Sequence, residues 1–446
     1  MRGLRSLLLL LVVLAGLAAY IKYGLPKSED DGLQGRVFQG LESDAITAIT
    51  VTNKAGETTT LTKNGVVWSI TAPVALRGSD MEGSTLANAI AGLNQTRIVD
   101  EHPTDLKPYG LDPPKMTVVF TATGSAQPKT LYLGIGSGTG SSIYARTSDN
   151  PRVMLVPEYN DGSFNKGIFD LRDKAILSVE REKVDGIDVA LGPERFAFAR
   201  KGTDWALTAP TPLRADTSLV DGLATALTTA SMTRAVAEAT TPDALATYGL
   251  TAPSATFVVH AGTSTATLAI GRDADDTSVF ARDAARPEIF TMAKTAVADL
   301  RKTAADYRRK ELFDMKAFTA RSVQITRNGA TLALSKVSAT KDGEKDTWTR
   351  TAPASGEADG DKVATLLAGL ADVRATSDTT PAPRSALSAP VLVAAITFGD
   401  ASTTERVTIG RVGDRAYARR DDEGTIVAVD AAKLTDLVAT LDELLK

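Results

Sequence analysis

The sequence predicts an α+β protein of three tandem repeats, each an antiparallel sheet with helices, preceded by one N-terminal transmembrane helix. The phrases Trp-Ser-Ile-Thr-Ala-Pro, Trp-Ala-Leu-Thr-Ala-Pro and Trp-Thr-Arg-Thr-Ala-Pro recur roughly every 140 residues, and together they contain all three tryptophans of the 446-residue chain. Between them, short runs of alternating apolar and polar residues flank stretches with the apolar spacing of a helix. These two observations carry the prediction of fold class.

The N-terminal segment combines two arginines in the first five residues with an apolar run over residues 7–21. Residues 4–23 are long enough to cross a bilayer if the flanking basic side chains reach the headgroups. We therefore predict a transmembrane anchor at 1–23 and a polar tether at 24–40, with a cleaved signal peptide as the alternative. The distribution of Lys and Arg favours an N-terminus inside and the bulk of the chain outside the cytoplasm.

The predicted repeat units are residues 41–178, 179–315 and 316–446, and further phrases recur in them in the same order. Tyr-Gly-Leu-Asp-Pro-Pro at 109–114 becomes Tyr-Gly-Leu-Thr-Ala-Pro at 248–253, and Ser-Ala-Leu-Ser-Ala-Pro in the third unit. A strand ending in Leu-Gly or Ile-Gly follows, and then Tyr-Ala-Arg or Phe-Ala-Arg. Each unit is long enough to form a domain with its own core.

In the first unit, three runs between residues 45 and 71 are rich in Thr, Val and Ile and alternate as strands do. A helix should follow from about Asp80 as its N-cap, because Leu86, Ile90 and Leu93 share one helical face. Four more strand-like runs follow the Tyr-Gly-Leu turn, and a second helical segment closes the unit. Short strands joined by tight turns favour antiparallel pairing, with helices on one face of the sheet.

The other two units follow the same plan. We expect a helix after Asp216 in the second unit and one near Asp361 in the third. Residues 431–446 form one amphipathic stripe of leucines and valine, which predicts the helix that closes the third unit.

Residues that recur in every unit are expected to build the fold, because a catalytic site is seldom needed three times. These structural anchors are Trp68, Trp205, Trp348, Tyr109, Gly110, Tyr248 and Gly249. Each tryptophan should end a strand, before the Thr-Ala-Pro that stops it, and lie buried under the following helix. Each glycine of the Tyr-Gly pairs should adopt a positive φ.

No pattern indicates an active site, a cofactor site or a metal site. The chain has no cysteine, and its two histidines, His102 and His260, lie in different units, which leaves no zinc ligand set. The Gly-rich stretch 133–142 lacks the Lys-Ser/Thr of a phosphate-binding loop and lies between two expected strands. A net charge of −4 argues against nucleic-acid binding. We therefore expect a non-enzyme; an enzyme whose carboxylates meet only in space is the least favoured alternative.

One basic cluster lies where the second unit joins the third. It consists of Arg301, Lys302, Arg308, Arg309 and Lys310. Two interpretations are open: the cluster pairs with carboxylates at the junction, or it contacts an acidic partner.

The order of these phrases resembles the bacterial family called domain of unknown function 4340, over about residues 40–446. The third unit departs from the pattern, because Ser-Ala-Leu replaces Tyr-Gly-Leu and it has no counterpart of the Leu-Arg-Asp-Lys phrase at 171–174. Members of this family are similar to accessory proteins of gliding-motility-type ABC exporters. The resemblance implies a single-pass protein of the bacterial inner membrane, with its bulk in the periplasm, that works with an ABC-type permease and ATPase.

The combined expectation is a membrane-anchored, extracytoplasmic, non-catalytic accessory or structural subunit associated with an ABC-type export system. It would contact the membrane through residues 4–23, bind no nucleic acid and need no cofactor. The alternative is an envelope ligand-binding module for a polysaccharide, peptidoglycan or lipid. The resemblance brings no catalytic residues with it.

Overall fold

The computed structural model describes residues 35–446 except 126, 139, 340–345, 377–381 and 384. The predicted anchor at 1–23 and residues 24–34 of the predicted tether lie outside the described residues. Among those that are described, no helix is both long and apolar enough to span a bilayer. The chain divides into two compact units, Met1–Lys174 and Ala175–Lys446.

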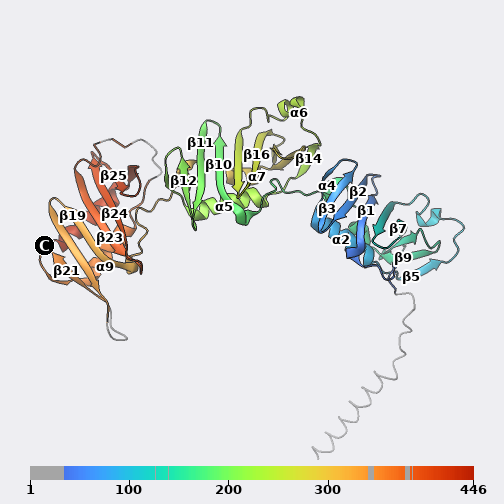
Figure 1. Ribbon diagram of the computed structural model, residues 1–446, viewed down its shortest axis with the longest axis horizontal. Coiled ribbons are helices and arrows are strands. Elements are labelled where there is room, and N and C mark those ends of the chain that lie inside the picture. The colour runs from blue at the N-terminus through green and yellow to red at the C-terminus, as the bar shows by residue number, and fades with distance from the viewer. Residues whose placement is uncertain (1–34, 126, 139, 340–345, 377–381, 384) are drawn as a thin grey trace, which may run out of the picture. The chain divides into compact units, whose positions relative to one another are not determined.

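Three antiparallel sheets dominate the described chain, one in each predicted repeat range (Figure 1). We call the segments that contain them the first, second and third repeats. Leu312, Phe313 and Met315 pack in the core of the third sheet, so residues from Lys310 onward are counted with the third repeat. The first repeat forms one compact unit, and the second and third repeats together form the other. The α+β fold with three antiparallel sheet units is therefore confirmed.

The first sheet has nine strands in the order β4-β3-β2-β1-β6-β7-β8-β9-β5. Its strands are β1 Ile46–Thr52, β2 Thr58–Asn64, β3 Val67–Ala72, β4 Leu76–Arg77, β5 Arg97–Asp100, β6 Met116–Ala122, β7 Lys129–Gly136, β8 Ser142–Thr147 and β9 Val153–Pro157. The helices of this repeat are α2 Asp80–Ala91, α3 Tyr159–Phe164 and α4 Ile168–Leu171.

The second sheet repeats this order as β13-β12-β11-β10-β15-β16-β17-β18-β14. Its strands are β10 Val184–Leu191, β11 Glu194–Lys201, β12 Asp204–Ala209, β13 Leu213–Arg214, β14 Arg234–Ala237, β15 Ala255–Ala261, β16 Ser264–Asp273, β17 Ser278–Asp283 and β18 Ile289–Ala293. The helices are α5 Thr217–Thr229, α6 Pro242–Thr247, α7 Lys294–Leu300 and α8 Ala304–Tyr307.

The third sheet has eight strands in the order β22-β21-β20-β19-β23-β24-β25-β26. They are β19 Ala320–Arg327, β20 Ala330–Val337, β21 Thr347–Ala352, β22 Gly356–Ala358, β23 Pro390–Phe398, β24 Thr403–Val412, β25 Arg415–Arg420 and β26 Val427–Val429. Two helices, α9 Gly360–Ala371 and α10 Ala431–Leu444, accompany them.

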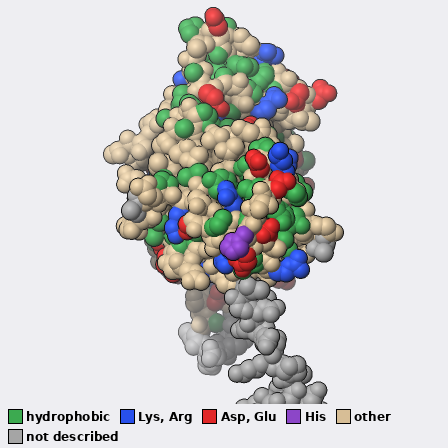
Figure 2. Space-filling view, turned by 90° about the vertical axis from the view of Figure 1, so that its right-hand side faces the viewer, with side chains coloured by type: hydrophobic (Ala, Val, Ile, Leu, Met, Phe, Trp, Pro, Cys, Tyr) green, Lys and Arg blue, Asp and Glu red, His purple; other side chains and the backbone are tan. Residues whose placement is uncertain are grey.

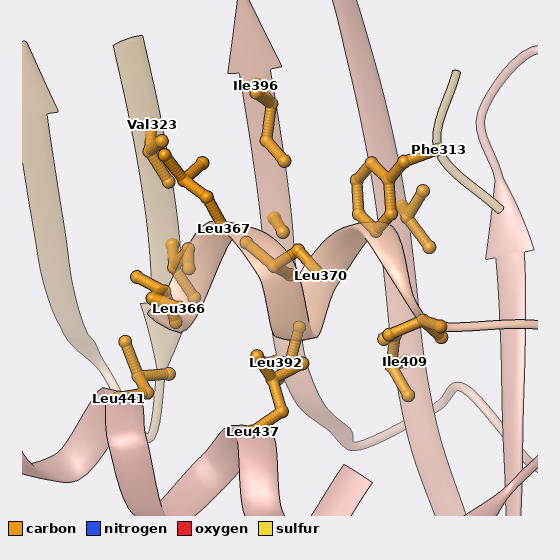
Figure 3. Packing of buried hydrophobic residues seen from close by; sticks show 14 of the residues in the cluster. Phe313, Val323, Leu366, Leu367, Leu370, Leu392, Ile396, Ile409, Leu437 and Leu441 are labelled. Carbon is orange, nitrogen blue, oxygen red and sulfur yellow. The ribbon is translucent and has the colours of Figure 1, made fainter. Parts of the chain in front are cut away.

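Each repeat has its own hydrophobic core between one face of the sheet and its helices. In the third repeat, Leu366, Leu367 and Leu370 of α9 point toward the apolar side chains of the sheet (Figure 3). Leu437 and Leu441 of α10, which lies below α9 in this view, belong to the same core. The apolar stripe predicted for the last helix is thus the face of α10 that packs against the core.

The three tryptophans are buried, with exposed fractions of 0% for Trp68, 2% for Trp205 and 7% for Trp348. The prediction that each tryptophan ends its strand is wrong. Each is the second residue of its strand, and the strand ends at the alanine before the proline. The proline of each phrase marks where the strand ends, but the alternating residues before it do not determine where the strand begins.

The predicted start of the first helix is also shifted by one residue. Ser79 is the N-cap of α2 and its side chain accepts from the N–H of Glu82. Asp80 is the first helical residue, and its Oδ1 instead accepts from the N–H of Trp68 at 2.7 Å. The helices expected after Asp216 and near Asp361 are present as α5 and α9, and their N-caps are Asp216 and Asp359.

The Tyr-Gly turn and the Leu-Gly strand end belong to one packing contact. Gly110 and Gly249 have φ of 65° and 72°, which confirms the prediction for the turn. A Cβ on Gly134 would lie 2.0 Å from the carbonyl oxygen of Tyr109, and one on Gly271 would lie 2.2 Å from that of Tyr248. Only glycine lets the turn approach the strand so closely.

Candidate functional site at the junction of the second and third repeats

In the structure, the basic cluster predicted from sequence divides into two groups. Arg301 and Lys302 form one, and Arg308, Arg309 and Lys310 form the other. Arg301 donates from Nη2 to Oγ of Ser254 at 2.8 Å. Lys302 and Lys310 are exposed, whereas Arg308 and Arg309 are half-buried. The cluster is therefore not one continuous basic surface, and only its C-terminal part faces the junction.

Arg308 and Arg309 lie where the chain leaves the second repeat. Arg308 forms a β-bridge with Ala215, and burial lowers the pKa of its guanidinium although Glu423 lies nearby. Nη2 of Arg309 is 2.7 Å from Oδ1 of Asp314. Arg309 thus contacts a junction carboxylate, as the first interpretation expected, and Arg308 lies near another. Whether a partner also contacts the cluster stays a prediction.

Arg214, at the end of β13, reaches from the second repeat into the third with its whole guanidinium. Its Nε donates to Oε1 of Glu423. Its Nη1 donates to Oδ1 of Asp314 at 2.6 Å, and its Nη2 donates to the carbonyl of Glu311 at 2.7 Å. Three donors on one planar group fix both distance and orientation, because the geometry of guanidinium is rigid.

Arg420 continues the network inside the third repeat. Its Nε and Nη2 each donate to one oxygen of Asp422 at 2.8 Å, and its Nη1 donates to the carbonyl of Leu312 at 2.7 Å. Its Nη1 is also 3.3 Å from Oε1 of Glu405, and the two side chains are only 5% and 3% exposed. Oε2 of Glu405 accepts from the N–H of Asp314 at 2.9 Å.

The pKa shifts agree with this burial. Burial raises the pKa of Glu405, and the neighbouring Arg420 only partly offsets the effect. Burial disfavours the charged form of Arg420, but its hydrogen bond to Asp422 and the charge of Glu405 outweigh this and raise its pKa. The same hydrogen bond lowers the pKa of Asp422. Removing one partner of such a buried ion pair is strongly destabilising, because it leaves the other charge buried and unpaired.

We call Arg214, Arg309, Asp314, Glu405, Arg420, Asp422 and Glu423 the junction network. The sequence pointed to Arg309 but not to the other six, which lie up to 209 residues apart along the chain. Alignment of the repeats with one another gives one sequence signal that points to this network. Asp173 of the first repeat occupies the place of Arg309 in the second, which is a reversal of charge.

The other structural anchors do not meet at one site. Trp68, Trp205 and Trp348 lie in separate cores, and the Tyr109 and Tyr248 turns lie in separate repeats. Among the described residues of 35–446, no three or more His, Cys, Asp or Glu side chains are placed to hold a metal ion. His260 pairs with Asp188, with Nε2 2.9 Å from Oδ2.

The Gly-rich stretch 133–142 lies only partly between strands, because residues 133–136 belong to β7 and residue 142 to β8, which pair as an antiparallel hairpin. A hollow of about 330 Å³ lies beside it, lined in part by Lys54, Lys115 and Gly134. Lys54 is already paired, with Nζ 2.6 Å from Oδ1 of Asp161. On the face shown in Figure 2, acidic, basic and apolar side chains are interspersed rather than gathered by type.

Sequence comparison places these repeats in a family. The family described as Domain of unknown function (DUF4340) matches residues 68–206 and again residues 205–349. The chain belongs to this family. The second DUF4340 match contains Arg214, Arg309 and Asp314, so this part of the junction network lies within a family unit.

A comparison of the DUF4340 chain with curated proteins finds no match. Among solved structures it aligns with a DNA polymerase sliding clamp from Pseudomonas aeruginosa with ligand, and with the DNA polymerase III subunit beta from the same organism. Both are 8% identical and the alignments cover 90% of this chain and 94% of the other, with TM-scores of 0.15 and 0.16. Likeness at this level carries no argument about fold or function.

Proposed function

We propose that this DUF4340 protein is a membrane-anchored, extracytoplasmic, non-catalytic accessory subunit of an ABC-type export system at the bacterial inner membrane. The observation that carries the proposal is the tandem of three similar sheets, two of which are joined by the junction network. Two domains held together by such a network suit a protein that positions partners. The apolar run at 4–23 supports an anchor beside permease helices.

The face of each sheet opposite the buried core is consistent with a scaffold. In β1, buried Ile49 and Val51 alternate with Thr50 and Thr52, which face the other way. The hydroxyl of Thr50 is 3.0 Å from that of Thr60 on β2. In the third repeat a similar threonine pair joins the equivalent strands β19 and β20, and another joins β23 and β24. These hydroxyl pairs link neighbouring strands on the face of the sheet that lies away from the core.

Co-purification from native membranes tests the proposal. The tagged chain is extracted with a mild detergent and captured, and its partners are quantified by mass spectrometry. We expect a permease and an ATPase in fixed ratio, and we expect both to be lost from a variant that lacks residues 1–23. Capture of the chain alone under every extraction condition would contradict the proposal.

One observation favours the second candidate, an envelope ligand-binding module. The rings of Tyr109 and Tyr144 lie 5.1 Å apart, and the guanidinium of Arg146 lies 4.9 Å from the ring of Tyr132. Tyr144, Arg146 and Tyr132 share one face of the first sheet, because Tyr132 pairs with Arg146 and Tyr144 lies two residues away. Half-exposed aromatic rings beside an arginine suit sugar rings with anionic groups.

Thermal shift of the purified chain with soluble peptidoglycan fragments separates the two candidates. The binding module predicts a rise in melting temperature that Tyr144→Ala abolishes. Tyr159→Ala is the matched control, because that ring is 70% exposed and lies in α3, away from the group. Equal shifts in both variants, or no shift in the parent chain, would count against this candidate.

A further inference from the structure

Backbone hydrogen bonds hold the linker between the second and third repeats on both sides. The N–H of Arg309 donates to the carbonyl of Arg214 in the second repeat at 2.9 Å. The carbonyl of the next residue, Lys310, accepts from the N–H of Ala375 in the third repeat at 2.7 Å. Adjacent residues are therefore bound to different repeats, which confines the joint between them to the backbone of Arg309 and Lys310.

Side chains also cross this joint. Arg214 contacts Glu423, Asp314 and the carbonyl of Glu311, all beyond the joint. Its side chain is 21% exposed and that of Glu423 is 10% exposed, so solvent screens the pair only in part. Rotation about the joint would break these contacts together.

In the first repeat, the arginine equivalent to Arg214 lies beside a residue of opposite charge. Arg77 takes the place of Arg214 there, and its Nε lies 3.2 Å from Oδ2 of Asp173. As in the second repeat, the N–H of residue 173 donates to the carbonyl of residue 77. In the first repeat, the side chains of Arg77 and Asp173 are therefore paired with each other, at the same two positions that the backbone hydrogen bond joins. In the second repeat the position of Asp173 is held by Arg309, which repels Arg214.

We propose that this reversal of charge turns Arg214 outward into the third repeat, where it locks the second and third repeats into one rigid body. Release of Arg214 lets the third repeat pivot about Arg309 and Lys310. This lock determines how the two repeats move, and it does not require that the chain be an export subunit. It makes residue 309 the determinant of whether the joint is locked.

Two spin labels measure the joint directly, because the chain has no cysteine of its own. Thr263→Cys and Ala401→Cys place one label in an exposed turn of each repeat of the full chain. Double electron–electron resonance should give one narrow distance distribution for the parent chain. Arg309→Asp should broaden it or add a second maximum, because the introduced carboxylate pairs with Arg214 and repels Asp314.

Arg214→Ala removes the same contacts by a different route, so it remains informative if Arg309→Asp does not fold. Arg77→Ala is the matched control, since it breaks the equivalent arginine pair in the first repeat and should leave the distribution unchanged. A narrow distribution in both folded junction variants would overturn the proposal. A broad distribution in the parent chain would overturn it as well.

Discussion

Gly83 offers a direct test of how the first tryptophan is packed, because it lies in α2 against the indole of Trp68. A Cβ at position 83 would lie 2.4 Å from Cγ and 2.6 Å from Cδ2 of that ring. Replacing a helical glycine with alanine normally stabilises by about 1 kcal/mol, whereas overpacking a filled core costs about 1–3 kcal/mol. The ring is fully buried, so we expect overpacking to outweigh the helical gain and Gly83→Ala to lower the free energy of unfolding by up to about 2 kcal/mol.

Gly222→Ala in α5 is the matched control, because no atom lies within 4 Å of the added Cβ. It should raise the free energy of unfolding by about 0.5–1 kcal/mol. Hydrogen exchange followed by mass spectrometry resolves peptides of α2 from those of α5, and so reports each repeat separately. If both alanines stabilise to the same extent, the indole does not lie beneath α2 and the packing described for Trp68 is wrong.

Three further outcomes follow from the same structure. Gly134→Ala should destabilise the first repeat because its Cβ would meet a carbonyl, while Gly136→Ala should not, since nothing lies within 4 Å of its Cβ; thermal melts of the two variants check this. Trp68→Ala should lower the free energy of unfolding by about 3–5 kcal/mol, measured by urea denaturation, and a loss under about 1 kcal/mol would make the tryptophan a surface contact. The depressed pKa of Asp422 contributes stability above the unfolded pKa that is lost as pH falls through the folded pKa. Asp422→Asn should therefore flatten the acid limb of stability against pH, and an unchanged limb would show that Asp422 is not coupled to Arg420.

The repeat and its α+β class could be predicted because alternation and helical spacing are local signals that recur in the same order. The burial of Trp68 and the turn geometry of Gly110 followed from the same phrases. The edge strands β4 and β5, their counterparts β13 and β14, and β22 of the third sheet were missed. β5 and β14 are four residues long and carry no alternation, and they are defined only by pairing with β9 and β18. Such pairing depends on tertiary context rather than on local propensity.

The candidate site was predictable only in outline. The basic cluster marked the junction, but its partners Asp314, Glu405 and Arg420 are charged residues in ordinary surroundings, and nothing in their spacing sets them apart. The burial of Glu405 arises only when β24 and the linker come together. A charged residue becomes informative in sequence when aligned repeats disagree on its sign, as Asp173 and Arg309 do.

The glycine beneath the Tyr-Gly turn has a consequence for how the copies of this domain can diverge. In the third repeat Ser-Ala-Leu replaces Tyr-Gly-Leu, yet a Cβ on Gly410 would still lie 2.1 Å from the carbonyl of Ala386. The glycine accommodates a backbone carbonyl, which every amino acid supplies. The side chains of the turn can therefore differ between repeats while the turn keeps its contact with the strand. Each repeat can thus present a different surface on the same backbone.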